Sequence, residues 1–166
     1  MPIQRRKQQG IVFFVSIFAI LIVDQSLKSL VRLKLAVGES IPLINNIFHI
    51  TYVTNTGAAF GLFKNSAIFF IIISVVAIVL IAGLILKSIK RAEFMANPRF
   101  DLGLIMIISG AIGNLADRLK FGYVIDFIDV RIWPVFNIAD TSITIGTMLL
   151  ILSYMCQKRP VQIDKL

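Results

Sequence analysis

Two aspartates, Asp126 and Asp140, are the residues whose type and placement best fit catalytic chemistry. Each lies at the edge of an apolar run, in the stretches VIDF and FNIAD, and together they bracket one short loop. Two close carboxylates cannot both ionise cheaply, so the pair shares a proton. The ionised member can take a proton from water while the other donates one to a carbonyl oxygen or a leaving amine. In the alternative, Asp140 merely caps a helix and Asp126 caps a loop.

A third acid, Asp129, follows Asp126 by three residues. It could replace Asp126 in the pair, or it could be an exposed loop residue that pairs with Arg131. The spacing alone leaves both possibilities open.

Other polar side chains could support a carboxylate pair. Asn114 and Arg118 are four residues apart and therefore share one helix face. We expect them to hold the pair and to bind backbone carbonyls of a substrate. In the alternative, Asp117 and Arg118 anchor the helix at a membrane surface.

Asp24 and Lys28 are also four residues apart. This spacing predicts an ion pair on one helix, which would orient whatever lies above it. Asn55 and Asn137 offer amide groups for a substrate backbone or for positioning the carboxylates.

The elements that position these residues are membrane spans. The chain of 166 residues is 57% hydrophobic and 16% charged, with a mean hydropathy of +0.86. A soluble domain is about 45–50% apolar and about 25% charged. Four apolar runs, about 11–31, 66–86, 102–119 and 138–155, reach the length of about 20 residues that a transmembrane helix needs. We therefore predict an all-α membrane protein with one domain over residues 1–166.

The first apolar run follows a basic stretch, as a secretory signal would. No small-x-small cleavage site follows the run, so we expect an uncleaved first helix. Four spans place both termini on one side of the membrane. Ten of the 17 basic residues then lie on that side, which we assign to the cytoplasm by the positive-inside rule. The same rule accounts for the net charge of +8, and we expect no nucleic-acid partner because no basic stripe with interleaved aromatics is present.

The other side of the membrane receives two loops, about 32–65 and 120–137. Residues 41–53 are rich in β-branched and aromatic residues around a turn signal at Asn45-Asn46. They predict a hairpin or small sheet lying on the membrane surface.

The polar residues of the spans are expected at similar depths in the membrane. With a rise of about 1.5 Å per residue, Asp24, Asn114, Asp117 and Asp140 all fall in the outer third of the hydrocarbon core, which is about 30 Å thick, or at its outer interface. An ionisable side chain at that depth costs about 2.5–3.5 kcal/mol and marks a functional site by default. Their coincidence at one level favours a site over scattered ion pairs.

Five stretches of the chain, in order, resemble the lipoprotein signal peptidases (signal peptidase II) of bacteria. They are DQSLK at 24–28, NTGAAF at 55–60, GAIGNLADR at 110–118, GYVIDF at 122–127 and FNIAD at 136–140. The likeness covers nearly the whole chain, with the same layout of four spans and a small sheet formed by the first outer loop.

The resemblance implies an aspartic endopeptidase of the bacterial cytoplasmic (inner) membrane, with its site facing outward. Such enzymes cleave prolipoproteins just before a cysteine that carries diacylglycerol, and they are the target of the antibiotic globomycin. The resemblance makes Asp126 and Asp140 the catalytic pair and Asp129 a neighbour. The partners that we expect are diacylglyceryl-prolipoproteins and membrane lipid, with no cofactor and a monomeric state. The residues that it places in supporting or substrate-binding roles are Asp24, Lys28, Asn55, Gly57, Asn114, Asp117, Arg118 and Asn137.

Two other classes of protein compete with this interpretation. A small proton-coupled transporter or channel subunit would spread polar residues along the full membrane depth, whereas the cytoplasmic halves of the four runs are nearly free of charge. A non-catalytic assembly factor would give no reason for acids at both ends of the second outer loop. With one histidine and one cysteine in the chain, we expect no metal site.

Overall fold

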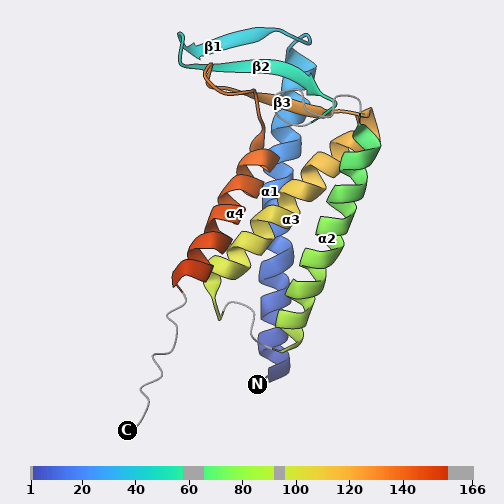
Figure 1. The fold of residues 1–166 in the computed structure, drawn as a ribbon, viewed down its shortest axis with the longest axis vertical. Helices are drawn as coiled ribbons and strands as arrows, with labels where there is room; N and C mark the ends of the chain where they lie inside the picture. The colour runs from blue at the N-terminus through green and yellow to red at the C-terminus, as the bar shows by residue number, and fades with distance from the viewer. Residues whose placement is uncertain (1, 58–65, 92–95, 157–166) are drawn as a thin grey trace.

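A computed structural model describes residues 2–57, 66–91 and 96–156. It contains four helices, α1 (Pro2–Lys34), α2 (Ala67–Lys90), α3 (Pro98–Phe121) and α4 (Ile138–Cys156). All four are long and apolar enough to cross a membrane, so the predicted spans are confirmed as helices. The helices run along the length of the molecule, and a small sheet covers the end opposite the N-terminus (Figure 1).

The first three helices extend beyond their predicted apolar cores. For example, α1 begins at Pro2 and ends at Lys34, whereas hydropathy marked only 11–31. The reason is that hydropathy detects the lipid-facing part of a helix, while backbone hydrogen bonding continues into the polar flanks. The end of the NTGAAF stretch and the basic residues after residue 156 lie outside the described residues.

The central helix of the bundle is α3. Its most apolar window is 61% buried inside the protein, compared with 6% for α2. Among the described residues, α3 contacts α1, α2 and α4, whereas α2 and α4 do not contact each other. Helices α2 and α4 are therefore separated from each other, and α3 lies between them.

Small residues let α3 and α4 approach closely. A Cβ added to Gly103 would lie 2.8 Å from the carbonyl oxygen of Gly146, and one added to Gly146 would lie 2.7 Å from that of Gly103. A Cβ on Gly110 would collide with the carbonyl oxygen of Ala139. Backbone contact of this kind is typical of membrane helices. Because no hydrophobic effect drives such helices together in lipid, they associate through close van der Waals packing, which small side chains permit. It fixes the start of α4 against α3.

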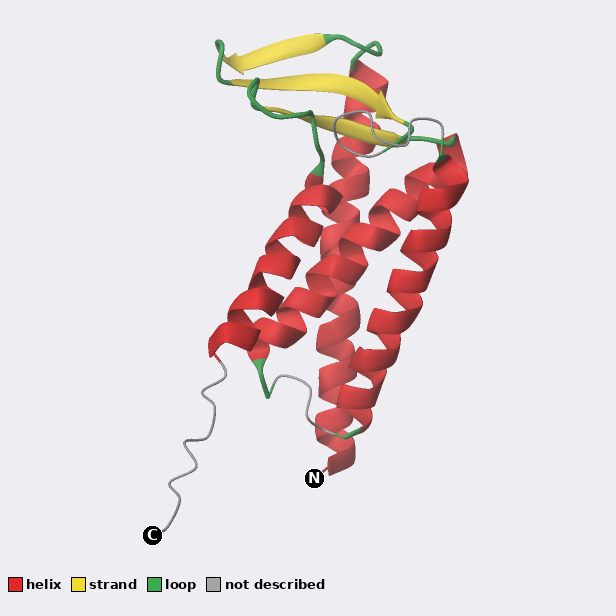
Figure 2. Cartoon of the chain, viewed as in Figure 1, coloured by secondary structure: helices red, strands yellow, loops and turns green. Residues whose placement is uncertain are grey.

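The sheet has three antiparallel strands in the order β1 (Ser40–Ile44), β2 (Phe48–Asn55) and β3 (Val124–Asp129) (Figure 2). The predicted hairpin within 41–53 is confirmed as β1 and β2, and Asn46 takes a positive φ of 60° in its turn. The second outer loop, about 120–137, contains β3, a strand that was not predicted from the sequence. Five of the six residues of β3 are buried, so the polar–apolar alternation that marks a half-exposed strand is absent.

Two apolar clusters hold these layers together. One lies within the bundle and includes Phe13, Ile85 and Ile105. The other joins the end of α1 to the sheet through Leu35, Tyr52 and further buried residues. The second cluster matters for function because it fixes β3, and with it Asp126, against the helices.

Candidate active site

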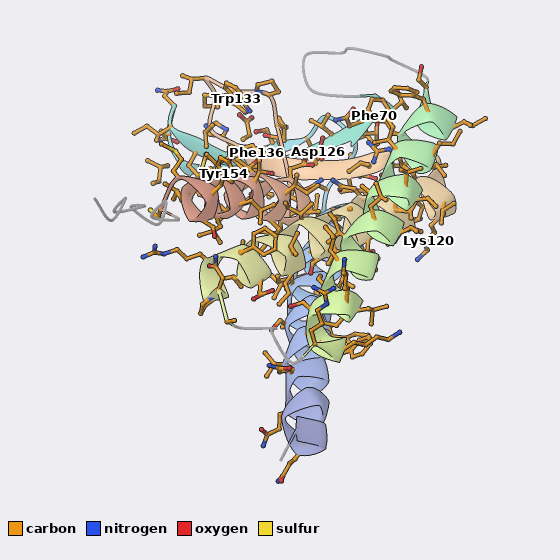
Figure 3. All side chains as sticks on the ribbon, turned by 60° about the horizontal axis from the view of Figure 1, so that its bottom comes forward. Phe70, Lys120, Asp126, Trp133, Phe136 and Tyr154 are labelled. Atoms are coloured by element: carbon orange, nitrogen blue, oxygen red, sulfur yellow. The ribbon has the colours of Figure 1, made fainter. Side chains whose placement is uncertain are left out.

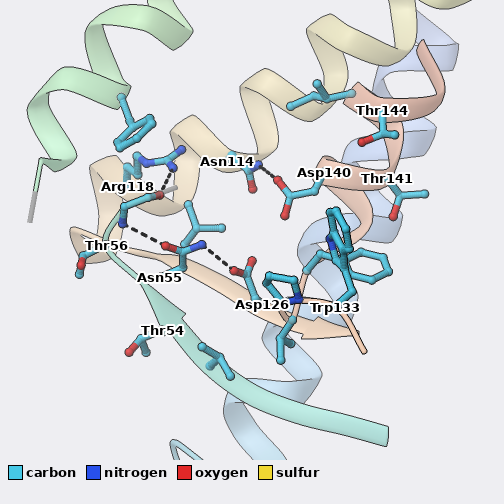
Figure 4. Close-up of a pocket in the computed structure, with 18 of the residues that line it drawn as sticks. Thr54, Asn55, Thr56, Asn114, Arg118, Asp126, Trp133, Asp140, Thr141 and Thr144 are labelled. Carbon is cyan, nitrogen blue, oxygen red and sulfur yellow. Dashed lines mark hydrogen bonds between the residues drawn. The ribbon is translucent and has the colours of Figure 1, made fainter. Parts of the chain in front are cut away.

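Asp126 and Asp140 line one cavity of about 950 Å³ at the sheet end of the bundle (Figure 4). Asp126 belongs to β3, opposite Val53 of β2, and is 1% exposed. Asp140 lies in the first turn of α4 and is half-buried. In the view of Figure 3, Asp126 lies between Phe70 and Phe136, which line the same cavity. The two predicted acids therefore come together from different elements.

Asp126 is held by two amides. Asn55 Nδ2 donates to its Oδ2 at 2.9 Å, and Asn137 Nδ2 donates to its Oδ1 at 2.6 Å. Burial, and then the nearby charge of Asp140, raise the pKa of Asp126 to about 7, although both amides and the charge of Lys28 act in the opposite direction. Close to neutral pH, Asp126 therefore exists in both protonation states.

Asp140 also receives an amide hydrogen bond, from Asn114 Nδ2 to its Oδ1 at 2.7 Å. Its Oδ2 accepts from the backbone N–H of Asn137 at 3.3 Å, while its own N–H donates to Asn137 Oδ1 at 2.8 Å. This reciprocal pair is a capping box at the start of α4. Asp140 thus takes part in capping α4, as the alternative predicted, but it also lines the cavity.

Asn137 connects the two acids. It is 0% exposed, and its Nδ2 lies within 3.3 Å of acceptors on Asp126, Asn114 and Ile125. One amide thus binds one carboxylate through its nitrogen and the backbone of the other aspartate through its oxygen. Its position immediately before α4 explains how it reaches both.

A buried lysine supports the acids from within the helix bundle. Lys28 is 1% exposed and pairs with Asp24 at 3.0 Å, as predicted, but also with Asp117 at 2.9 Å. Its Nζ donates to Asn114 Oδ1 at 3.0 Å. Because the amide oxygen of Asn114 accepts from Lys28, its NH₂ group is directed toward Asp140. The lysine therefore orients the amide that binds the acid.

Asp24 acts across helices. Its Oδ1 accepts from the backbone N–H of Ala139 at 2.9 Å, so a side chain of α1 caps the first turn of α4. Gly113 gives Asp24 its space, since a Cβ there would lie 2.8 Å from Asp24 Oδ2. Gln25 Nε2 donates to Asp24 at 3.1 Å and to Asp117 at 3.0 Å. Gln25 was missed as a site residue, although it stands within the DQSLK stretch.

Asp117 and Arg118 do not form the predicted alternative, a mutual anchor. Asp117 Oδ2 accepts from the backbone N–H of Ile125 at 3.2 Å, which ties β3 to α3. Arg118 instead lines the cavity, 5.0 Å from the ring centroid of Phe70, and donates to the carbonyl oxygen of Gly57 at 3.4 Å. The N–H of Gly57 in turn donates to Asn55 Oδ1 at 3.0 Å.

Asp129 lies outside the lining of the cavity. Thr51 Oγ1 donates to it at 2.7 Å, and Arg131 donates through its backbone N–H at 2.8 Å and its guanidinium at 2.9 Å. Burial alone would raise the pKa of Asp129, but these hydrogen bonds and the charge of Arg131 hold it below its usual value. The pairing of Asp129 with Arg131, one of the two open possibilities, is therefore the one observed, although Asp129 is buried rather than exposed.

The apolar wall of the cavity was not predicted. Phe70 comes from α2 and Trp133 and Phe136 come from the connection between β3 and α4. Of these residues, Trp133 could have been suspected from the sequence, because it is the single tryptophan of the chain and tryptophans favour membrane interfaces. Among residues 2–57, 66–91 and 96–156, no group of three or more His, Cys, Asp and Glu side chains could hold a metal ion.

Comparisons with known proteins identify the family of the chain. The family model described as signal peptidase (SPase) II matches residues 16–156. The lipoprotein signal peptidase of Halothermothrix orenii is 46% identical over 148 residues, which cover 89% of this chain and 97% of that protein. That of Clostridioides difficile is 46% identical over 129 residues, or 76% of this chain and 83% of that protein.

Solved structures give the same result. A bacterial membrane enzyme determined by the in meso method at 2.3 Å resolution superposes with a TM-score of 0.81 at 30% identity, covering 93% of this chain and 94% of that one. A second such enzyme, determined at 1.9 Å resolution, gives a TM-score of 0.77 at 31% identity, with coverages of 88% and 94%. On these matches, the chain belongs to the signal peptidase II family.

Proposed function

We propose that Asp126 and Asp140 are the catalytic pair with which this membrane enzyme removes the signal peptides of prolipoproteins. The observation that carries the proposal is their placement in one cavity, where burial and the neighbouring acid raise the pKa of Asp126 to about 7. A pair in this state holds one proton near neutral pH. One proton between two carboxylates is the condition that water activation by an aspartate dyad requires.

The reaction proceeds through a water molecule between the acids. The ionised carboxylate takes a proton from the water, whose oxygen attacks the scissile carbonyl carbon. The protonated carboxyl donates its proton to the carbonyl oxygen. When the C–N bond breaks, the carboxyl that took the water proton donates it to the leaving amine. The other carboxylate takes a proton from a hydroxyl group of the tetrahedral intermediate, so the dyad again holds one proton. Asn55, Asn114 and Asn137 hold the carboxylates in place, because each donates an amide N–H to one of them.

Substrate binding follows from the walls of the cavity. The apolar side, with Trp133 and Phe136, suits the diacylglyceryl group on the cysteine after the cleaved bond. Arg118 supplies N–H donors for backbone carbonyls of the signal peptide. The remaining support comes from Asp24, Lys28 and Asp117 below the dyad.

The placement in the membrane completes the proposal. The chain acts as one integral membrane domain and as a monomer in the inner membrane, with both termini in the cytoplasm and the dyad at the extracytoplasmic face. The basic residues Lys87, Lys90 and Arg91 at the end of α2 remote from the sheet support this orientation. No observation on the described residues favours the transporter alternative.

The test is cleavage of a diacylglyceryl-modified prolipoprotein by the purified full-length protein in detergent. Asp126→Asn and Asp140→Asn should each abolish turnover, and thermal unfolding should show that both variants remain folded. Asp129→Asn is the matched control and should retain activity. Turnover by a folded Asp126→Asn or Asp140→Asn variant would refute the assignment, and inhibition by a chelator would indicate a metal mechanism instead.

A further inference from the structure

A second group of charged side chains lies at the same end of the bundle, outside the active-site cavity. Arg32, in the last turn of α1, places its guanidinium carbon 4.4 Å from the ring centroid of Phe121. Lys120, in the last turn of α3, places its Nζ 5.0 Å from the same centroid. Two cations from different helices thus converge on one aromatic ring, and both distances are within the range of a cation–π interaction. In Figure 3, Lys120 lies at the edge of the molecule, away from Asp126.

The ring itself is firmly held. Phe121 packs against the apolar cluster that joins α1 to the sheet, and it stacks on Tyr123 with centroids 5.9 Å apart. The two cations therefore share a fixed platform. Because both lie within about 5 Å of one point, they are at most about 10 Å apart, which is the screening length at 0.1 M salt. An anion that contacts both cations would offset the repulsion between them.

No carboxylate of the described residues neutralises this pair: the ion pairs found there join Lys28 to Asp24 and Asp117, and Arg131 to Asp129. Tyr52 does not serve either, because burial and its hydrogen bond with Tyr123 raise its pKa to about 12 and keep it neutral. Arg32 and Lys120 are both exposed, so an anion from outside these residues can reach them.

The surroundings indicate which anion is available. Leu33 is 80% exposed and Leu119 is 67% exposed, so the residues next to the two cations present apolar side chains outward. Both helices are membrane spans that end at Lys34 and Phe121. The cations therefore lie where lipid acyl chains give way to headgroups, and basic side chains near a membrane surface attract the phosphates of anionic lipids.

We propose that Arg32 and Lys120, held on the ring of Phe121, bind the phosphate of an anionic phospholipid in the leaflet that contacts the sheet end of the bundle. The site is separate from the cavity of the proposed catalytic pair. A lipid held there fixes the depth of α1 and α3, the two helices that carry Lys28 and Asn114, relative to the membrane surface.

The test is native mass spectrometry of the full-length protein released from micelles containing phosphatidylglycerol or phosphatidylcholine. The wild type should retain more phosphatidylglycerol. Arg32→Gln and Lys120→Gln should each reduce that retention about fivefold, the effect of one basic residue at an anionic surface. Phe121→Leu, which keeps both charges but removes the platform, should also reduce it. Lys34→Gln, an equal loss of charge in the last turn of α1 but off the ring, should reduce it distinctly less than either of these variants.

Conservative variants keep the test decisive if a glutamine variant unfolds, since Arg32→Lys and Lys120→Arg should retain the lipid. Equal retention of the two lipids by the wild type would overturn the proposal, as would wild-type retention in both glutamine variants. Displacement of the lipid by millimolar inorganic phosphate would overturn the lipid assignment and indicate a general phosphate site.

Discussion

Asp24 gives the sharpest test of how the fold positions the active site, because it lies on α1 yet caps α4. Its Oδ1 accepts the backbone N–H of Ala139, the residue immediately before Asp140, and its Oδ2 pairs with Lys28. Asp24→Ala removes both contacts. Asp24→Asn removes the charge but keeps an oxygen that can accept from Ala139.

The expected magnitudes follow from these contacts. Loss of an N-terminal cap costs about 0.5–2 kcal/mol. Loss of a partner from a buried ion pair costs about 3–5 kcal/mol when it leaves the other charge unpaired, but Lys28 keeps Asp117 at 2.9 Å and Asn114 at 3.0 Å, so only part of this cost applies. We expect Asp24→Ala to fold with a lowered melting temperature. Because Asp140 shifts with the frayed first turn of α4, kcat should fall about 100-fold, the cost of misplacing a catalytic group by about 1 Å.

The assay compares kcat and KM for a diacylglyceryl-prolipoprotein with thermal unfolding of the same samples. Asp24→Asn should restore most of kcat relative to Asp24→Ala while its melting temperature remains below that of the wild type. KM should change little in both variants, since Asp24 does not line the cavity. Wild-type kcat in folded Asp24→Ala would refute the view that α1 positions α4, and equal kcat in the two variants would refute capping as the cause.

Three further predictions concern the dyad, the helix contact and the cavity wall. The folded protein binds the proton of Asp126 up to a pKa of about 7, whereas an aspartate ordinarily has a pKa of 3.8. Its stability should therefore fall as the pH rises between these values, and Asp126→Asn should melt above the wild type at pH 8 but not at pH 4. Gly110→Ala inserts a methyl group against the α4 backbone and should cost about 1–3 kcal/mol by overpacking, with loss of activity. Gly83→Ala, where a Cβ meets nothing within 4 Å, should have neither effect in the same melting and cleavage assays. Phe70→Leu removes the ring beside Arg118 and should raise KM several-fold, for a contact worth about 0.5–2 kcal/mol, while Phe70→Tyr should restore it; an unchanged KM in Phe70→Leu would contradict this role.

The sequence was informative where polar residues interrupt apolar runs. Asp24 and Lys28, or Asn114 and Arg118, stand out because a membrane helix excludes such residues unless they have partners inside the protein. Their spacing of four predicts which of them share a helix face, and counting the rise per residue predicts their common depth. The four helices followed from the length of the apolar runs, and the expected level of the site followed from the rise per residue.

Partners on different elements could not be read in this way. Nothing in the spacing indicates that Asp24 caps α4, because the contact with Ala139 joins residues 115 positions apart. Lys28 similarly has one partner on its own helix and another, Asp117, on α3. The strand that carries Asp126 was missed because it is buried on both faces, which removes the alternation by which strands are recognised.

Charge balance explains why the site keeps a proton. The network contains four carboxylates, on Asp24, Asp117, Asp126 and Asp140, which are linked directly or through amides to one buried ammonium, that of Lys28. Asp24 and Asp117 both lie within 3.0 Å of that ammonium and offset most of its charge, so its effect on Asp126 is smaller than that of burial and of Asp140. The amides around Asp126 and Asp140 stabilise negative charge but supply none of the opposite sign. Arg118 lines the same cavity, so the four carboxylates face two cations. A second ionisation in the dyad would therefore leave a further uncompensated charge in a buried site, which is costly. Retaining one proton between the two acids is the cheaper state, and it is also the state that the proposed hydrolysis requires.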